Sequence, residues 1–192
     1  MVYLTILWDV ARFFCIGFVG VYRINDLAFS VIFVQILNIV GHLCRAAISK
    51  PFGRFSDKHS YATGIKVALS ISSVAFLSLA FTTPSTRWLI IVYSLLMSIS
   101  GAGTNANLSN ITYNYVDSEY FVEASAIKNS IGGLCGFVSA LVAGKLLSYI
   151  QTKGNTLFGI PVYGQQVLAL ILMIATILFV KLVIEKQKRI IQ

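Results

Sequence analysis

Six long runs of apolar residues, separated by short polar links, restrict what this chain can fold into. Crossing about 30 Å of hydrocarbon takes roughly 20 helical residues, and each run approaches or exceeds that length. A backbone in lipid must also satisfy its hydrogen bonds within its own segment, which favours helices. The predicted transmembrane helices cover residues 2–22, 28–49, 63–83, 88–112, 124–150 and 165–184.

The composition agrees with a membrane protein. Charged residues make up 11% of the chain, whereas soluble domains carry about 25%. The ten-residue alternation typical of a transmembrane strand barrel is absent. We therefore predict an all-α membrane protein in which residues 1–192 form a single six-helix bundle with a basic tail at 185–192. The start of the chain lacks the pattern of a signal peptide, so none is expected.

The distribution of Lys and Arg predicts the orientation, because cytoplasmic links carry the excess of positive charge. One side of the membrane receives nine of them: Arg45, Lys50, Arg54, Lys58, Lys66, Lys181, Lys186, Lys188 and Arg189. The opposite side receives Arg23, Arg87 and Lys153. Both termini are therefore expected in the cytoplasm and the protein in the plasma membrane, in contact with lipid. Basic residues placed between apolar runs, not on one soluble face, argue against a nucleic-acid partner.

The link after the second run, "KPFGRFSDKHSY" at residues 50–61, concentrates charge and turn residues. Gly53, Asp57 and Lys58 follow the order glycine, three residues, aspartate, basic residue. This order resembles the loop motif of the major facilitator superfamily, roughly G-x-x-x-D-(R/K)-x-G-(R/K)-(R/K), which occurs once in each six-helix half. Ser60 stands where the second glycine is expected, and the terminal basic pair is missing. Such a weakened copy is typical of the second half of these proteins.

The resemblance extends to other segments, "GVYRINDLAFS", "AIKNSIGGLCGF" and "GNTLFGIPVYGQQV". It implies that the six spans correspond to helices seven to twelve of a twelve-helix facilitator. It also implies that Gly53, Asp57 and Lys58 form a cytoplasmic gate. Gly53 would permit a tight turn and a close approach of helix ends, and Asp57 would bind the N-terminus of a neighbouring helix. The alternative is that the stretch only anchors the chain to anionic headgroups.

Charged residues inside a span need a reason, because each costs at least about 2.5 kcal/mol there. Asp9 and Arg12 are three residues apart, so they share one face of the first predicted helix. One interpretation is a substrate or proton site near the bilayer midplane, with Asp9 exchanging a proton. A second is a self-compensated pair inside the bundle. A third is that the native chain starts earlier and the pair lies nearer an interface.

Other polar residues inside the spans are candidates for the same pathway: Asn38, Asn105, Asn107 and Lys128. Asn38 shares a helix face with His42, for which a structural hydrogen bond is favoured over a metal site. The asparagines can bind a solute, or they can hydrogen-bond neighbouring helices. Lys128 can face a cavity or extend to the headgroups. Gly132 and Gly136, four apart, predict a close helix–helix contact.

The resemblance implies secondary active transport of a small solute by alternating access, with protons as a candidate coupling ion. Substrate sites in such carriers lie between two repeats, so we expect the chain to need an N-terminal six-helix half or a second copy of itself. The alternative function is a non-transporting remnant or assembly subunit that keeps the half-fold. The sequence has no catalytic constellation, so we expect neither an enzyme nor a metal or cofactor site.

Overall fold

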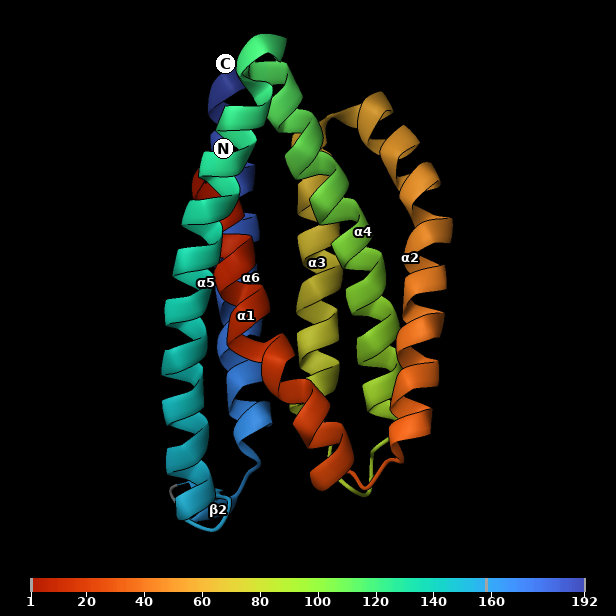
Figure 1. Ribbon diagram of the computed structural model, residues 1–192, viewed down its shortest axis with the longest axis vertical. Helices are drawn as coiled ribbons and strands as arrows, with labels where there is room; N and C mark the ends of the chain where they lie inside the picture. Colours follow the sequence, from red (N-terminus) through yellow and green to blue (C-terminus); the bar gives the residue numbers. More distant parts are fainter. Residues whose placement is uncertain (1, 158, 192) are drawn as a thin grey trace.

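In the computed structural model, which describes residues 2–157 and 159–191, the chain forms six long helices that run alternately up and down (Figure 1). They are α1 (Val2–Asn25), α2 (Val31–His59), α3 (Tyr61–Ala80), α4 (Leu89–Tyr115), α5 (Phe121–Thr152) and α6 (Gly164–Ile191). A single 3-10 turn, η1 (Ser118–Tyr120), precedes α5. Two-residue strands, β1 (Thr156–Leu157) and β2 (Ile160–Pro161), pair between α5 and α6. The all-α prediction is confirmed.

Five helices in the described part of the chain are long and apolar enough to cross a membrane: α2, α3, α4, α5 and α6. Large apolar side chains cover their outer surfaces, as at Ile32, Val122 and Leu134, which are 73%, 73% and 69% exposed. Such a surface suits lipid better than water. The fold is therefore compatible with a multi-pass membrane protein.

The first predicted span, residues 2–22, is helical as α1 but is not among those five helices. The side chains of residues 2–4 and 7 lie outside the described part of the chain, so the count of six spans stays a prediction. At the other end, the expected tail at 185–192 is an extension of α6 up to Ile191. Its basic side chains also lie outside the description.

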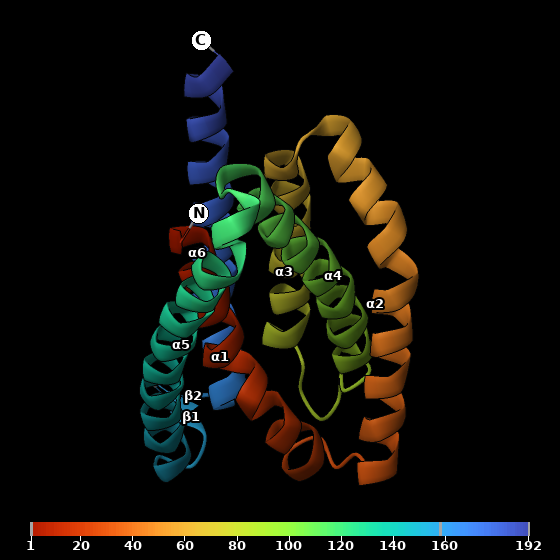
Figure 2. The ribbon, with the colours of Figure 1, turned by 45° about the horizontal axis from the view of Figure 1, so that its top comes forward.

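The second helix is longer than predicted. Residues 50–59, expected in a link, are the last turns of α2, with Pro51 inside the helix. These turns pack between α3 and α4: Phe52 lies against Gly103, and Ser56 lies against Gly64. The link shrinks to Ser60, whose hydroxyl accepts a hydrogen bond from the Thr63 backbone N–H over 3.2 Å and caps α3. Figure 2 shows α2 turning directly into α3 at this end.

The helices pair in a pattern that relates the two halves of the chain. Helix α1 packs along α5, and α2 packs along α4, while α3 contacts α4 and α6 and α6 contacts α1. Exchanging α1 with α4, α2 with α5 and α3 with α6 leaves this set of contacts unchanged. Because three alternating helices reverse the direction of the chain, the two three-helix units have opposite orientations (Figure 2).

Both termini lie at the same end of the bundle as the α2–α3 and α4–α5 links (Figure 1). At the opposite end, the Tyr22 hydroxyl donates to the Thr82 carbonyl over 2.6 Å, and Gln166 Nε2 donates to the same oxygen over 3.0 Å. These bonds join α1, the α3–α4 link and α6. The largest buried apolar cluster is contributed by α1, α3, α4 and α6 together with Leu27. The core therefore lies on the side of α1 and α4 that faces α3 and α6. The opposite side of α1 and α4 is left free of this core.

Candidate functional site: a polar groove

A polar groove lies on the face formed by α1, α2, α4 and α5. It consists of two cavities, the first of about 370 Å³ between α1, α2 and α4, the second of about 390 Å³ between α1, α4 and α5. Trp8, Arg12 and Asn105 line both, which makes the cavities neighbours. Neither α3 nor α6 contributes any of the described lining residues.

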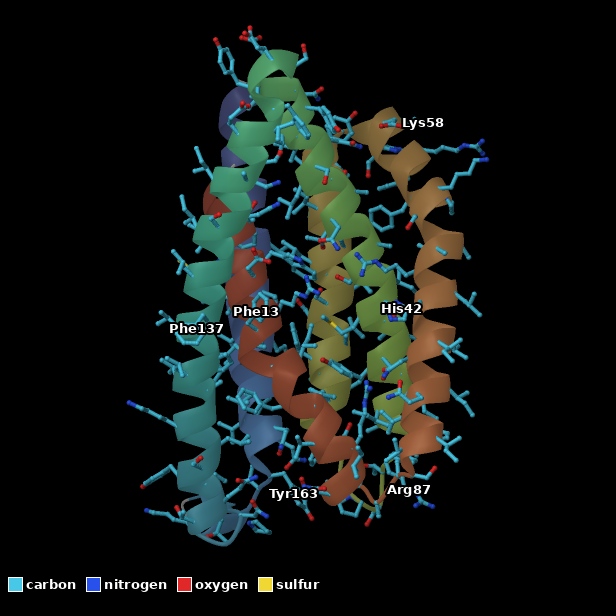
Figure 3. All side chains as sticks on the ribbon, viewed as in Figure 1. Phe13, His42, Lys58, Arg87, Phe137 and Tyr163 are labelled. Carbon is cyan, nitrogen blue, oxygen red and sulfur yellow. The ribbon has the colours of Figure 1, made fainter. Side chains whose placement is uncertain are left out.

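The first cavity is rich in ionisable and amide side chains. They are Arg12, Arg23, Asn38, His42, Arg45 and Asn105. Helical periodicity explains the gathering, because residues four and seven apart, such as Asn38, His42 and Arg45, share one face. Figure 3 labels His42 at mid-height, where α2 faces α4.

Arg23 joins three helices at the end of the first cavity. Its Nη1 donates to Asn38 Oδ1 over 3.2 Å, and its Nη2 donates to Ser94 Oγ over 2.6 Å. The side chain is only 9% exposed, and its Nε has no hydrogen-bond partner among the described residues. Arg23 is therefore a buried charge held by neutral groups.

The second cavity combines opposite charges. Asp9, Arg12 and Lys128 all line it, and the charges of Arg12 and Lys128 both act on the Asp9 carboxylate. Lys128 is 7% exposed, and its Nζ donates to Thr112 Oγ1 over 3.2 Å. Lys128 therefore faces the groove and does not extend to the headgroups.

The seam between α1 and α5 lies beside this cavity. The Asp9 carboxylate lies directly over Gly132, and the Phe13 ring lies over Gly136 with carbons about 3.0 Å from where a Cβ would stand. The two glycines thus let α1 approach α5 closely, at the spacing seen in the sequence.

Asn107 lies apart from the groove. Its side chain is fully buried, and its Nδ2 donates to the Gly103 carbonyl one turn earlier over 2.7 Å. It packs over Gly64 of α3, whose Cβ, if present, would stand about 2.6 Å from it. Of the predicted pathway residues, the structure brings together Asp9, Arg12, Asn38, Asn105 and Lys128 along the groove. Asn107 occupies a helix–helix contact.

The predicted gate residues lie at the end of α2. Asp57 and Lys58 are exposed, and the Asp57 carboxylate lies close to the Tyr61 hydroxyl at the start of α3. A Cβ on Gly53 would meet nothing within 4 Å, so this glycine supports neither a turn nor a close approach here. The turn falls at Ser60 and the close approach at Gly64.

Ser60 has a backbone conformation that glycine favours. Its φ of 145° and ψ of 153° lie in a region almost restricted to glycine. The turn between α2 and α3 thus falls at a position whose backbone suits glycine, although a serine stands there.

The predicted topology places Arg23 and Arg45 only in the links and their flanks. Arg45 lies at the middle of α2, because the helix continues to His59. Arg23 follows Arg12 by eleven residues, which is three helical turns, so both project to the same side of α1. That periodicity was the available signal for a cationic face.

Comparisons with protein-family models, with curated proteins and with solved structures find no match to this chain.

Proposed function

We propose that the chain is the C-terminal six-helix half of a major facilitator superfamily carrier that moves a small solute by alternating access. The polar groove carries this proposal, because it aligns ionisable and amide side chains along helices predicted to lie in lipid. Ionisable residues at membrane depth usually mark a solute or ion pathway. The groove also lies at the contact of α1, α2, α4 and α5, which belong to different three-helix units.

Two further features support the proposal. The helix contacts keep their pattern when the two three-helix units are exchanged, and such inverted repeats are nested within each half of these carriers. Ser60 adopts a glycine-like backbone at the position of the motif's second glycine. Under this proposal Gly53, Asp57 and Lys58 belong to a cytoplasmic gate, and both termini face the cytoplasm of a plasma-membrane protein.

A groove open on one face of a six-helix unit needs a second unit to enclose the solute. We propose an N-terminal six-helix half or a second copy of this chain in that position. Protons are the proposed coupling ion, with Asp9 as the group that carries them, because a carboxylate in the groove can gain and lose a proton.

The test is uptake into proteoliposomes that contain the full chain, alone or reconstituted with a six-span N-terminal half. A panel of labelled sugars, amino acids, nucleosides and carboxylates serves as solute. We expect saturable uptake of at least one solute, lost in Arg12→Gln. It should persist in Lys145→Gln, which removes an exposed charge of α5 outside the groove.

The second candidate is a non-transporting subunit, favoured by the open side of the groove, which can serve as a contact surface for another membrane protein. A non-transporting subunit predicts no uptake of any solute of the panel, whether the chain is inserted alone or together with the N-terminal half. That outcome, with correct insertion verified by protease protection, contradicts the carrier.

A further inference from the structure

The first cavity is lined by three arginines and by no described carboxylate, and only Arg12 among them also faces Asp9 of the second cavity. Arg12, Arg23 and Arg45 line it, and no Asp or Glu is among the described residues around it. Guanidinium groups stay protonated at all physiological pH values. At about 370 Å³ the cavity is also large enough for a small molecule.

Arg23 is the strongest sign that a ligand completes this cavity. The side chain is nine-tenths buried, yet its two hydrogen-bond acceptors, Asn38 and Ser94, are neutral. Neutral partners leave the charge uncompensated, which is costly for a buried charge. An incoming anion supplies the missing negative charge beside the buried guanidinium.

The neighbouring groups are arranged as donors. Asn38 Oδ1 accepts from Arg23, so the amide nitrogen of this lining residue remains available as a donor. Arginine binds carboxylate and phosphate oxygens through paired N–H groups. Arg12 on α1 and Arg45 on α2 line the same cavity, so both add positive charge that attracts an oxyanion.

We infer that the first cavity binds a small oxyanion, a carboxylate or phosphate, through Arg12, Arg23 and Arg45. This inference rests on the proposed carrier function in that it makes the transported solute an anion. A phospholipid headgroup offers the same phosphate chemistry, and the cavity is open on one side. We assign the site to a soluble anion, because its polar lining continues past Arg12 into the second cavity.

The test measures thermal unfolding of the full chain, purified in an uncharged detergent free of phospholipid. Malonate and inorganic phosphate are titrated against sodium chloride at constant ionic strength. At a hundred times Kd, the ligand should raise the folded-to-unfolded ratio about a hundredfold. Phosphate also stabilises proteins non-specifically, so the decisive quantity is the difference between the wild type and the variants.

We expect Arg23→Gln to abolish the anion-dependent rise in the unfolding midpoint. Arg45→Gln should weaken the anion affinity tenfold or more, so that the same rise needs a correspondingly higher anion concentration. Lys145→Gln, which also removes one positive charge, should respond like the wild type. Arg45 is only half-buried, so Arg45→Gln is expected to fold. It therefore tests the anion site even if Arg23→Gln does not fold.

A further arm adds phosphatidylglycerol to the detergent micelles in place of the soluble anions. Three results overturn the inference: no rise with either anion in the wild type, an equal rise in Arg45→Gln and Lys145→Gln, or a rise only with phosphatidylglycerol. These results are separable from failure of the carrier. Anion binding without uptake removes the carrier and keeps the site. Saturable uptake of a neutral solute without an anion-dependent rise removes the site and keeps the carrier.

Discussion

The Asn107 side chain of α4 lies directly over Gly64 of α3, so closely that a Cβ on Gly64 would stand about 2.6 Å from its amide nitrogen. Asn107 is held there by its bond to the Gly103 carbonyl, and Ser56 of α2 approaches the same glycine. Three helices therefore meet at a point that has no room for a methyl group. The position explains why glycine stands in the first turn of α3.

We predict that Gly64→Ala destabilises the protein by about 1–3 kcal/mol, because the added methyl group pushes the helices apart. Gly53→Ala is the matched control, since a Cβ there meets nothing within 4 Å. In the middle of a helix that change should stabilise by about 0.5–1 kcal/mol. Unfolding midpoints in detergent measure both. Equal effects of the two substitutions would contradict the packing at Gly64.

Ser60→Gly should stabilise the protein. The φ of 145° at Ser60 strains a side-chain-bearing residue by about 1–3 kcal/mol, and glycine removes that strain. Replacing the Ser60 cap of α3 by glycine costs only a few tenths of a kcal/mol. Ser60→Ala keeps the strain and loses the cap, so we expect it to destabilise by about 1 kcal/mol. A thermal-unfolding series in which glycine lowers the midpoint below that of alanine would show that the backbone is not strained.

The apolar runs made the helices predictable, because runs of such length in lipid have few alternatives to a helix. The end of α2 was not predictable in the same way. Pro51 and the surrounding charges are typical of a link, and the helix is continued by packing of Phe52 against Gly103, far along the chain. Such a contact is a property of the folded bundle, which local patterns do not contain.

In the groove, too, helical periodicity predicts part of the arrangement and long-range packing decides the rest. The sequence indicates that Asn105 and Asn107, two residues apart on a helix, project in different directions. Which of them meets the groove depends on where α3 packs, and α3 covers Asn107. Likewise, the hydrogen bond from Arg23 to Ser94 joins residues 71 positions apart. The local sequence around Arg23, which indicates a charge in a link, does not contain this contact.

Lys58 and Arg87 lie at opposite ends of the bundle (Figure 3). We predict that a membrane-impermeant maleimide added to intact cells labels Arg87→Cys and not Lys58→Cys, because the excess of basic residues is expected on the cytoplasmic side. The unsubstituted chain, with its three native cysteines, provides the background. After the membrane is permeabilised, both variants should react. Labelling of Lys58→Cys in intact cells would reverse the proposed orientation.

Among the described residues that line the polar groove, Asp9 is the one that carries a carboxylate. We predict that Asp9→Asn abolishes the stimulation of uptake by an inward proton gradient and leaves solute exchange without a gradient largely intact. The reason is that an amide fills the same space over Gly132 but cannot carry a proton. Asp117→Asn, an exposed acid in the α4–α5 link, is the matched control and should keep the full gradient response. If Asp9 only neutralises Arg12 and Lys128, its substitution should instead lower the unfolding midpoint and reduce gradient-driven uptake and exchange by the same factor.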